Sequence, residues 1–203
     1  DTTTPQGRRD KVLLTVLYDT AARVSELTNL TLDDIRLSQP ETIALTGKGD
    51  KTRIVPIMGV TVDLLKKYIE ENDLVNRRYT SQHYLFMSNH GTRLTRSGVS
   101  YILNKYVTAV NDSGTADIKI SVHPHTLRHT KAVHLLEAGV DLIYIRDLLG
   151  HISVTTTEVY AKVSQGNKRE ALEKAYEDIT NMDRSSWHEN SDLMTFLQNL
   201  CKE

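Results

Sequence analysis

Six side chains whose chemistry suits the cleavage of a phosphodiester are spread along this sequence. They comprise one phenol, two guanidinium groups, two imidazoles and one ammonium group, on Tyr160, Arg23, Arg128, His125, His151 and Lys48. A phenol oxygen that attacks phosphorus would break the ester and keep its energy in a covalent bond to the protein. The set therefore suggests phosphoryl transfer.

Each residue type has a role in such a reaction. Charge builds up on the oxygens of the pentacoordinate phosphorus, and the planar fork of arginine matches those oxygens bidentately. Arg23 and Arg128 are candidates for this pair, and His151 could donate a hydrogen bond to a non-bridging oxygen. Lys48 could protonate the leaving oxygen. His125 could accept the phenol proton, or the positive field could itself favour phenolate, so these side chains supply the charge without a metal ion.

The composition is that of an ordinary globular protein, with 39% hydrophobic and 25% charged residues among 203. A single cysteine, Cys201, rules out an internal disulfide, which is consistent with a reducing cytoplasm. No apolar run approaches the roughly 18 residues of a membrane helix. The net charge of −1 is low for a nucleic-acid binder. Residues 1–163 carry 20 Lys and Arg against 18 Asp and Glu, so DNA binding would need a local basic patch or another domain.

Hydrophobic periodicity predicts a mainly α-helical fold with a small antiparallel β-sheet. Within 41–58, two alternating β-branched runs flank Gly47-Lys48-Gly49-Asp50, which predicts a hairpin with Lys48 at its tip. Helices are predicted over 8–20, 24–30, 60–71, 95–110, 126–138, 141–149, 153–161 and 167–179. Helix ends are expected at two N-caps and two glycines, namely Thr95, Asp141, Gly139 and Gly150.

The motifs around the six residues resemble the catalytic domain of tyrosine recombinases, the phage-integrase-like enzymes, over roughly residues 5–177. Residues 22–27 (ARVSEL) are similar to the family's first arginine motif, with Arg23 as the catalytic arginine and Glu26 as its acidic support. Lys48 falls where the family's hairpin lysine lies, and Lys51 lies three residues further on. Residues 125–130 (HTLRHT) are similar to the His-x-x-Arg box. Residues 149–151 (LGH) are similar to the third box, and Tyr160 lies nine residues on, in the position of the nucleophile.

The resemblance implies a site-specific DNA recombinase or integrase that needs no cofactor and no metal. Tyr160 would attack the scissile phosphate, form a 3′-phosphotyrosyl bond and free a 5′-hydroxyl. A 5′-hydroxyl of a partner duplex would reverse the step, and two rounds through a four-way junction would complete recombination in a tetramer on DNA. The enzyme would act in the cytoplasm. The resemblance favours a bacterial mobile element or phage as its setting, and the sequence leaves phage integration, transposon movement and chromosome-dimer resolution open.

The resemblance also implies a division of the chain. Residues 1–180 are expected to form the catalytic domain, and 181–203 a linker and an amphipathic helix. The family's N-terminal core-binding domain is expected to be missing from this sequence. An apolar stripe at Leu193, Phe196, Leu197 and Leu200 has helical spacing. The segment 191–201 could pack on its own domain or dock on a neighbouring subunit. Candidate DNA contacts are Lys51, Arg53, Arg93 and Arg96.

Other functions remain open at this point. A type IB topoisomerase would use the same chemistry to relax DNA without exchanging partners. A non-cutting DNA-binding protein on the same fold is a further alternative, and the complete set of six residues argues against it. His123, His125 and His129 could suggest zinc, but the sequence has neither a His-Glu-x-x-His pattern nor a cysteine cluster.

Overall fold

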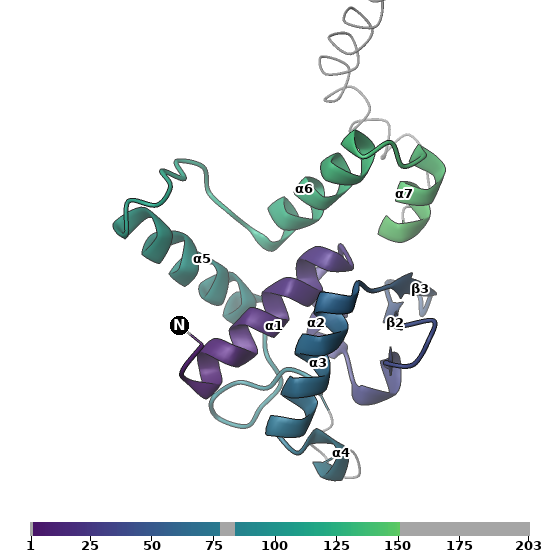
Figure 1. The fold of residues 1–203 in the computed structure, drawn as a ribbon, viewed down its shortest axis with the longest axis horizontal. Coiled ribbons are helices and arrows are strands. Elements are labelled where there is room, and N and C mark those ends of the chain that lie inside the picture. The colour runs from purple at the N-terminus through teal and green to yellow at the C-terminus, as the bar shows by residue number, and fades with distance from the viewer. Residues whose placement is uncertain (1, 78–83, 151–203) are drawn as a thin grey trace, which may run out of the picture. The chain divides into compact units, whose positions relative to one another are not determined.

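The structure is a computed structural model that describes residues 2–77 and 84–150 (Figure 1). These residues all belong to one compact unit, Asp1–Lys162. The described elements are, in order, α1 (Pro5–Asp19), α2 (Val24–Asn29), the 3₁₀-helix η1 (Leu32–Asp34), β1 (Ile35–Arg36), β2 (Thr42–Thr46), β3 (Thr52–Pro56), α3 (Gly59–Glu71), α4 (Leu74–Arg77), α5 (Arg96–Asp112), α6 (Pro124–Glu137) and α7 (Leu142–Leu149). The predicted fold class is confirmed. None of the helices described is long and apolar enough to cross a membrane.

Local capping chemistry determines where most helices begin. The hydroxyl of Thr95 accepts a hydrogen bond from the Gly98 amide at 3.0 Å, and the carboxylate of Asp141 accepts one from the Ile143 amide at 2.8 Å. Both predicted caps are therefore confirmed. Helix α1 begins three residues before the predicted start, because Thr4 caps it and Pro5 occupies its first turn.

The predicted hairpin is confirmed as the strands β2 and β3 of a three-stranded antiparallel sheet in the order β1-β2-β3. Ile43, Leu45 and Val55 are fully buried on its inner face, whereas Ile54 is 72% exposed on the other. The tip is closed by a hydrogen bond of 2.9 Å from the Gly47 amide to the Lys51 carbonyl. One face of the hairpin therefore packs in the core, and the tip of the hairpin lies beside the core.

Two hydrophobic clusters hold the elements together. The larger one lies between α1, the inner face of the sheet, α3 and α5, and its most buried members include Leu13, Leu17 and Leu65. The smaller one fastens α6 and α7 to the end of α1 through Ala21, Ala132, Leu136, Ile145 and Leu149. The second cluster therefore decides how closely α6 and α7 approach the segment after α1.

That segment contains an unusual backbone turn at Ala21. Its φ is +49°, a left-handed conformation that costs a residue with a side chain roughly 1–2 kcal/mol. The methyl group is fully buried in the second cluster, so alanine fills space there that glycine would leave empty. Nearby, the buried Asp19 accepts hydrogen bonds from Thr61 and Lys131, at 2.7 and 3.3 Å. These contacts tie the end of α1 to α3 and α6.

Candidate active site

Arg23 is positioned by the first turn of α2, which it precedes as the N-cap. Its backbone amide donates to Glu26 Oε2 at 2.7 Å and its Nη1 donates to Glu26 Oε1 at 2.8 Å. Its Nη2 donates to the carbonyl of Gly150 at 3.2 Å. The side chain is nevertheless 35% exposed. Glu26 and the Gly150 carbonyl therefore fix this guanidinium while part of it stays accessible to a ligand.

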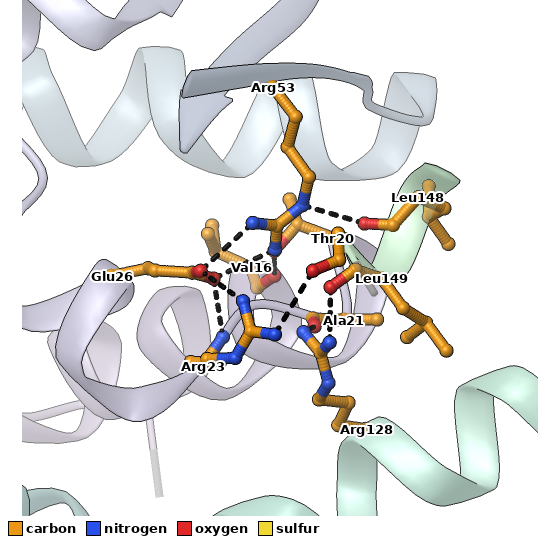
Figure 2. A network of polar contacts seen from close by, with 10 residues as sticks. Val16, Thr20, Ala21, Arg23, Glu26, Arg53, Arg128, Leu148 and Leu149 are labelled. Atoms are coloured by element: carbon orange, nitrogen blue, oxygen red, sulfur yellow. Dashed lines mark hydrogen bonds and ion pairs between the residues drawn. The ribbon is translucent and has the colours of Figure 1, made fainter. Parts of the chain in front are cut away.

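Glu26 lies almost fully buried between two guanidinium groups (Figure 2). Arg53 binds it bidentately, with Nη1 to Oε1 at 2.9 Å and Nη2 to Oε2 at 2.7 Å. Burial alone would raise the pKa of Glu26, but hydrogen bonds from Arg53 and Arg23, together with the charge of Arg53, lower that pKa from 4.5 to about 2. Glu26 is therefore a fixed negative charge at neutral pH.

Arg128 comes from the first turns of α6 and is buried. Its Nη1 donates to the Ala21 carbonyl at 2.6 Å, and its Nη2 donates to the Leu149 carbonyl. Ala21 lies two residues before Arg23. Its left-handed turn therefore presents the Ala21 carbonyl to Arg128. Figure 2 shows Arg23 and Arg128 converging on the same end of α7.

Three consecutive carbonyls at that end of α7 each accept a hydrogen bond from a different arginine. The Leu148 carbonyl accepts from Arg53 Nε at 2.7 Å. The Leu149 carbonyl accepts from Arg128, and the Gly150 carbonyl accepts from Arg23. The last carbonyls of a helix lack partners within it and carry partial negative charge. Guanidinium groups satisfy them here, so the chain is fixed just before His151.

His125, on the first turn of α6, is exposed to solvent. Its pKa is lowered by partial burial and by the positive charges of Arg128, His129, Arg23 and Arg96. A lowered pKa keeps the imidazole neutral at pH 7, the form that accepts a proton. The charges that act on His125 come from Arg23 before α2, from Arg96 on α5, and from Arg128 and His129 on α6.

Lys48 is exposed at the hairpin tip, next to Gly47. A Cβ on Gly47 would lie 2.9 Å from Glu26 Oε1 and 3.7 Å from Arg23 Nη1. Only glycine therefore allows the hairpin to pass this close to the Arg23–Glu26 pair. The approach brings the backbone next to Lys48 within reach of the arginine cluster.

The close approach at Gly47 gives a first prediction. In a Gly47→Ala variant the new methyl group must displace either the hairpin or a carboxylate held by several hydrogen bonds. We expect a loss of about 1–3 kcal/mol in the free energy of unfolding, measured by urea denaturation. Gly59→Ala is the matched control, because no heavy atom lies within 4 Å of a Cβ at Gly59. Equal stabilities of the two variants would contradict the steric argument.

The candidate DNA contacts occupy different environments. Lys51, Arg93 and Arg96 are exposed, and their contacts with DNA stay predictions. Arg93 donates to Asn29 at 2.7 Å and lies over the ring of Tyr84. Arg53 instead directs its guanidinium inward, to Glu26 and the Leu148 carbonyl, a role that the sequence reasoning did not assign to it.

The structure thus brings together Arg23, Glu26, His125 and Arg128, with the hairpin of Lys48 beside them. His151 and Tyr160 lie outside the described residues, as do the predicted helices over 153–161 and 167–179 and the apolar stripe of 193–200. Their roles stay predictions. The arrangement of the described residues suits the binding of a phosphate by two arginines beside a neutral imidazole.

Comparisons with known proteins point in the same direction. The sequence model described as the phage integrase family matches residues 1–167. Tyrosine recombinase XerC of Oceanobacillus iheyensis is 40% identical over 178 residues, which cover 87% of this chain and 56% of that protein. Tyrosine recombinase XerD of Listeria innocua is 41% identical over 166 residues, covering 81% and 54%. The chain thus spans about half the length of the curated relatives it matches.

Solved structures resemble the fold. The crystal structure of XerA recombinase has a TM-score of 0.69 at 32% identity, over 84% of this chain and 57% of that one. XerH site-specific recombinase, bound to palindromic difH substrate in a post-cleavage complex, also has a TM-score of 0.69, at 26% identity. That match covers 85% of this chain and 47% of that one.

Proposed function

This chain belongs to the phage integrase family, and we propose that it is the catalytic part of a tyrosine site-specific recombinase that cleaves and rejoins DNA. The observation that carries the proposal is the convergence of Arg23 and Arg128, from separate helices, on the end of α7 that leads to His151. Two relatives of this chain are named tyrosine recombinases. The catalytic domain would comprise residues 1–180.

The two arginines would bind the non-bridging oxygens of the scissile phosphate. Because Glu26 and the Gly150 carbonyl already hold Arg23, and the carbonyls of Ala21 and Leu149 already hold Arg128, little reorganisation is needed when charge develops. Donors of this kind are typically worth about 3–4 kcal/mol each in the transition state. A hydrogen bond from His151 to the phosphate would add to them.

The reaction requires two proton transfers. The oxygen of Tyr160 attacks phosphorus, and its proton passes to the neutral imidazole of His125. The bond to the 5′-oxygen breaks, and Lys48 at the hairpin tip protonates that oxygen as it leaves. The product is a 3′-phosphotyrosyl bond and a free 5′-hydroxyl. Attack by a 5′-hydroxyl of the partner duplex runs the same steps backwards and restores the phosphodiester.

Strand exchange requires more than this chain. We propose that the protein binds a double-stranded recombination site and assembles as a tetramer on it, completing exchange through a four-way junction. Lys51, Arg93 and Arg96 would contact the DNA backbone. The helix of 191–201 would dock on a neighbouring subunit, and a bacterial mobile element or phage would supply the biological setting. XerH site-specific recombinase, solved with palindromic difH substrate as a post-cleavage complex, supports the DNA-cutting role by resemblance.

Covalent capture tests the proposal. The protein is mixed with nicked, randomised DNA duplexes in EDTA, denatured with SDS, and the attached DNA is sequenced. We expect adducts with the unmodified protein and none with Tyr160→Phe, which should still bind DNA. SDS-resistant adducts in the Tyr160→Phe variant would refute the nucleophile assignment, and adducts that require added metal would refute the metal-free mechanism. A second assay on supercoiled plasmids that carry the captured sequence separates a recombinase, which yields recombinant junctions, from a topoisomerase, which yields relaxed circles alone.

A further inference from the structure

Building on the proposed function, we infer that Arg53 is a positioning residue for DNA cleavage. It joins three parts of the site: the hairpin on which it sits, the Arg23–Glu26 pair, and the end of α7 (Figure 2). It holds the catalytic arginine in place without touching the phosphate.

The strand register explains why Arg53 points into the protein. Arg53 pairs with Leu45 across the sheet and shares a face with Val55, two residues on. Leu45 and Val55 are fully buried, so this is the core face. The side chain of Arg53 is accordingly only 14% exposed. It is therefore unsuited to a phosphate contact, although the hairpin tip lies close by.

All three nitrogens of the guanidinium have protein acceptors. Nε donates to the Leu148 carbonyl at 2.7 Å, and the two Nη atoms bind the two oxygens of Glu26 at 2.9 and 2.7 Å. A Cβ on Gly150 would lie 3.1 Å from the Cδ and Nη1 atoms of Arg53. The end of α7 therefore packs directly on the side chain of Arg53. This contact fixes the position of the Gly150 carbonyl, which accepts the hydrogen bond from Arg23.

Charge balance gives Arg53 a second effect. Glu26 orients Arg23, but a lone carboxylate at 2.8 Å would also cancel the positive charge that Arg23 offers a phosphate. Arg53 binds the same carboxylate at 2.7 Å, so the three side chains together keep a net charge of +1. Glu26 can then fix the geometry of Arg23 while the pair of arginines still attracts an anion.

The first arm of the test measures cleavage. Arg53→Gln and Arg53→Lys are compared in the full-length protein, on the nicked duplex that the unmodified protein captures best. Single-turnover cleavage at saturating DNA should fall about 100-fold in Arg53→Gln, because small misplacements of catalytic groups cost about that much. In Arg53→Lys, which keeps the charge but loses the fork, it should fall about tenfold. DNA affinity should change less than about threefold, with an unchanged salt slope.

Arg36→Gln is the matched control, since Arg36 lies exposed on β1 and donates only to the Gln39 carbonyl among the contacts described for it. It should cleave like the unmodified protein. Loss of affinity with a reduced salt slope in the Arg53 variants, at an unchanged saturated rate, would make Arg53 a DNA contact. Saturated rates within about threefold of the unmodified protein would equally overturn the inference.

The second arm does not depend on activity. The backbone amide of Arg23 donates to Glu26, and this bond should loosen when Arg53 is lost. Amide hydrogen exchange at Arg23 should become at least about tenfold faster in Arg53→Gln, while amides within α5 stay unchanged. Unchanged exchange at Arg23 refutes the positioning role, whatever the protein does to DNA. If the unmodified protein forms no adducts, the proposed function fails, and exchange alone decides whether Arg53 holds Arg23.

Discussion

Replacing Glu26 by alanine should lower the free energy of unfolding by about 3–5 kcal/mol, the usual cost of removing one partner from a buried ion pair. The carboxylate is almost fully buried and binds the guanidinium groups of Arg23 and Arg53. Without it, two cations face each other, one of them in a largely buried position. We expect urea denaturation at pH 7 to show this loss, and covalent cleavage to be lost with it.

The pH dependence of stability provides a sharper form of the same test. In the folded protein the pKa of Glu26 is lowered from 4.5 to about 2. A lowered carboxyl pKa stabilises the folded state above the unfolded-state pKa, and that stabilisation is lost as the pH falls from about 4.5 towards 2. The shift corresponds to about 3 kcal/mol. The Glu26→Gln variant should therefore lose less stability than the unmodified protein over this window.

Glu71→Gln is the matched control for this comparison, because Glu71 pairs with Arg8 in a partly exposed ion pair at 2.8 Å. Exposed pairs contribute about 0–1 kcal/mol. Its stability should follow that of the unmodified protein from pH 7 to pH 2. If Glu26→Gln shows the same acid sensitivity as this control, Glu26 is not the group that responds to acid.

Replacing Arg128 by lysine should reduce covalent cleavage by about 10²–10³-fold although the charge is kept. A lysine cannot hold the carbonyls of Ala21 and Leu149 in the fork geometry that Arg128 uses. One buried carbonyl would lose its donor, at a cost of about 1–3 kcal/mol in unfolding free energy. The captured fraction of nicked duplex and the urea midpoint together measure both effects.

Arg146→Lys makes the same chemical change on the neighbouring helix α7, where Arg146 pairs with Asp147 at the surface. Both its cleavage rate and its stability should stay close to those of the unmodified protein. A cleavage rate of Arg128→Lys within a few-fold of this control would show that charge alone suffices at that position. The bidentate role proposed for Arg128 would then be wrong.

Features of the fold that depend on local chemistry could be predicted from the sequence. The hairpin followed from turn residues between alternating strands, and the caps Thr95 and Asp141 followed from side chains next to helical periodicity. The start of α1 at Pro5 was missed, because the capping Thr4 precedes the first apolar residues. Helix α4 was missed as well, since four residues are too few for a periodic signal.

The site was predicted in part. Motif spacing identified Arg23, Glu26 and Arg128, but their contacts with backbone carbonyls of α7 depend on the tertiary packing of the second cluster. The inward direction of Arg53 could have been found from alternation, because Arg53 and Val55 share the face opposite to Ile54. A DNA contact by Arg53 stays a prediction, which the salt dependence of binding by its variants tests.

The arginines of this site recognise α7 through its main-chain oxygens, and every amino acid supplies such an oxygen. The arginine cluster therefore does not depend on the outer side chains of α7. These include Ile143 and Tyr144, which are 53% and 71% exposed. Substitutions at these two exposed positions should therefore leave the three arginine–carbonyl hydrogen bonds in place. The peptide backbone of α7 thus holds the arginines, so the exposed side chains of this helix can change in type without removing those contacts.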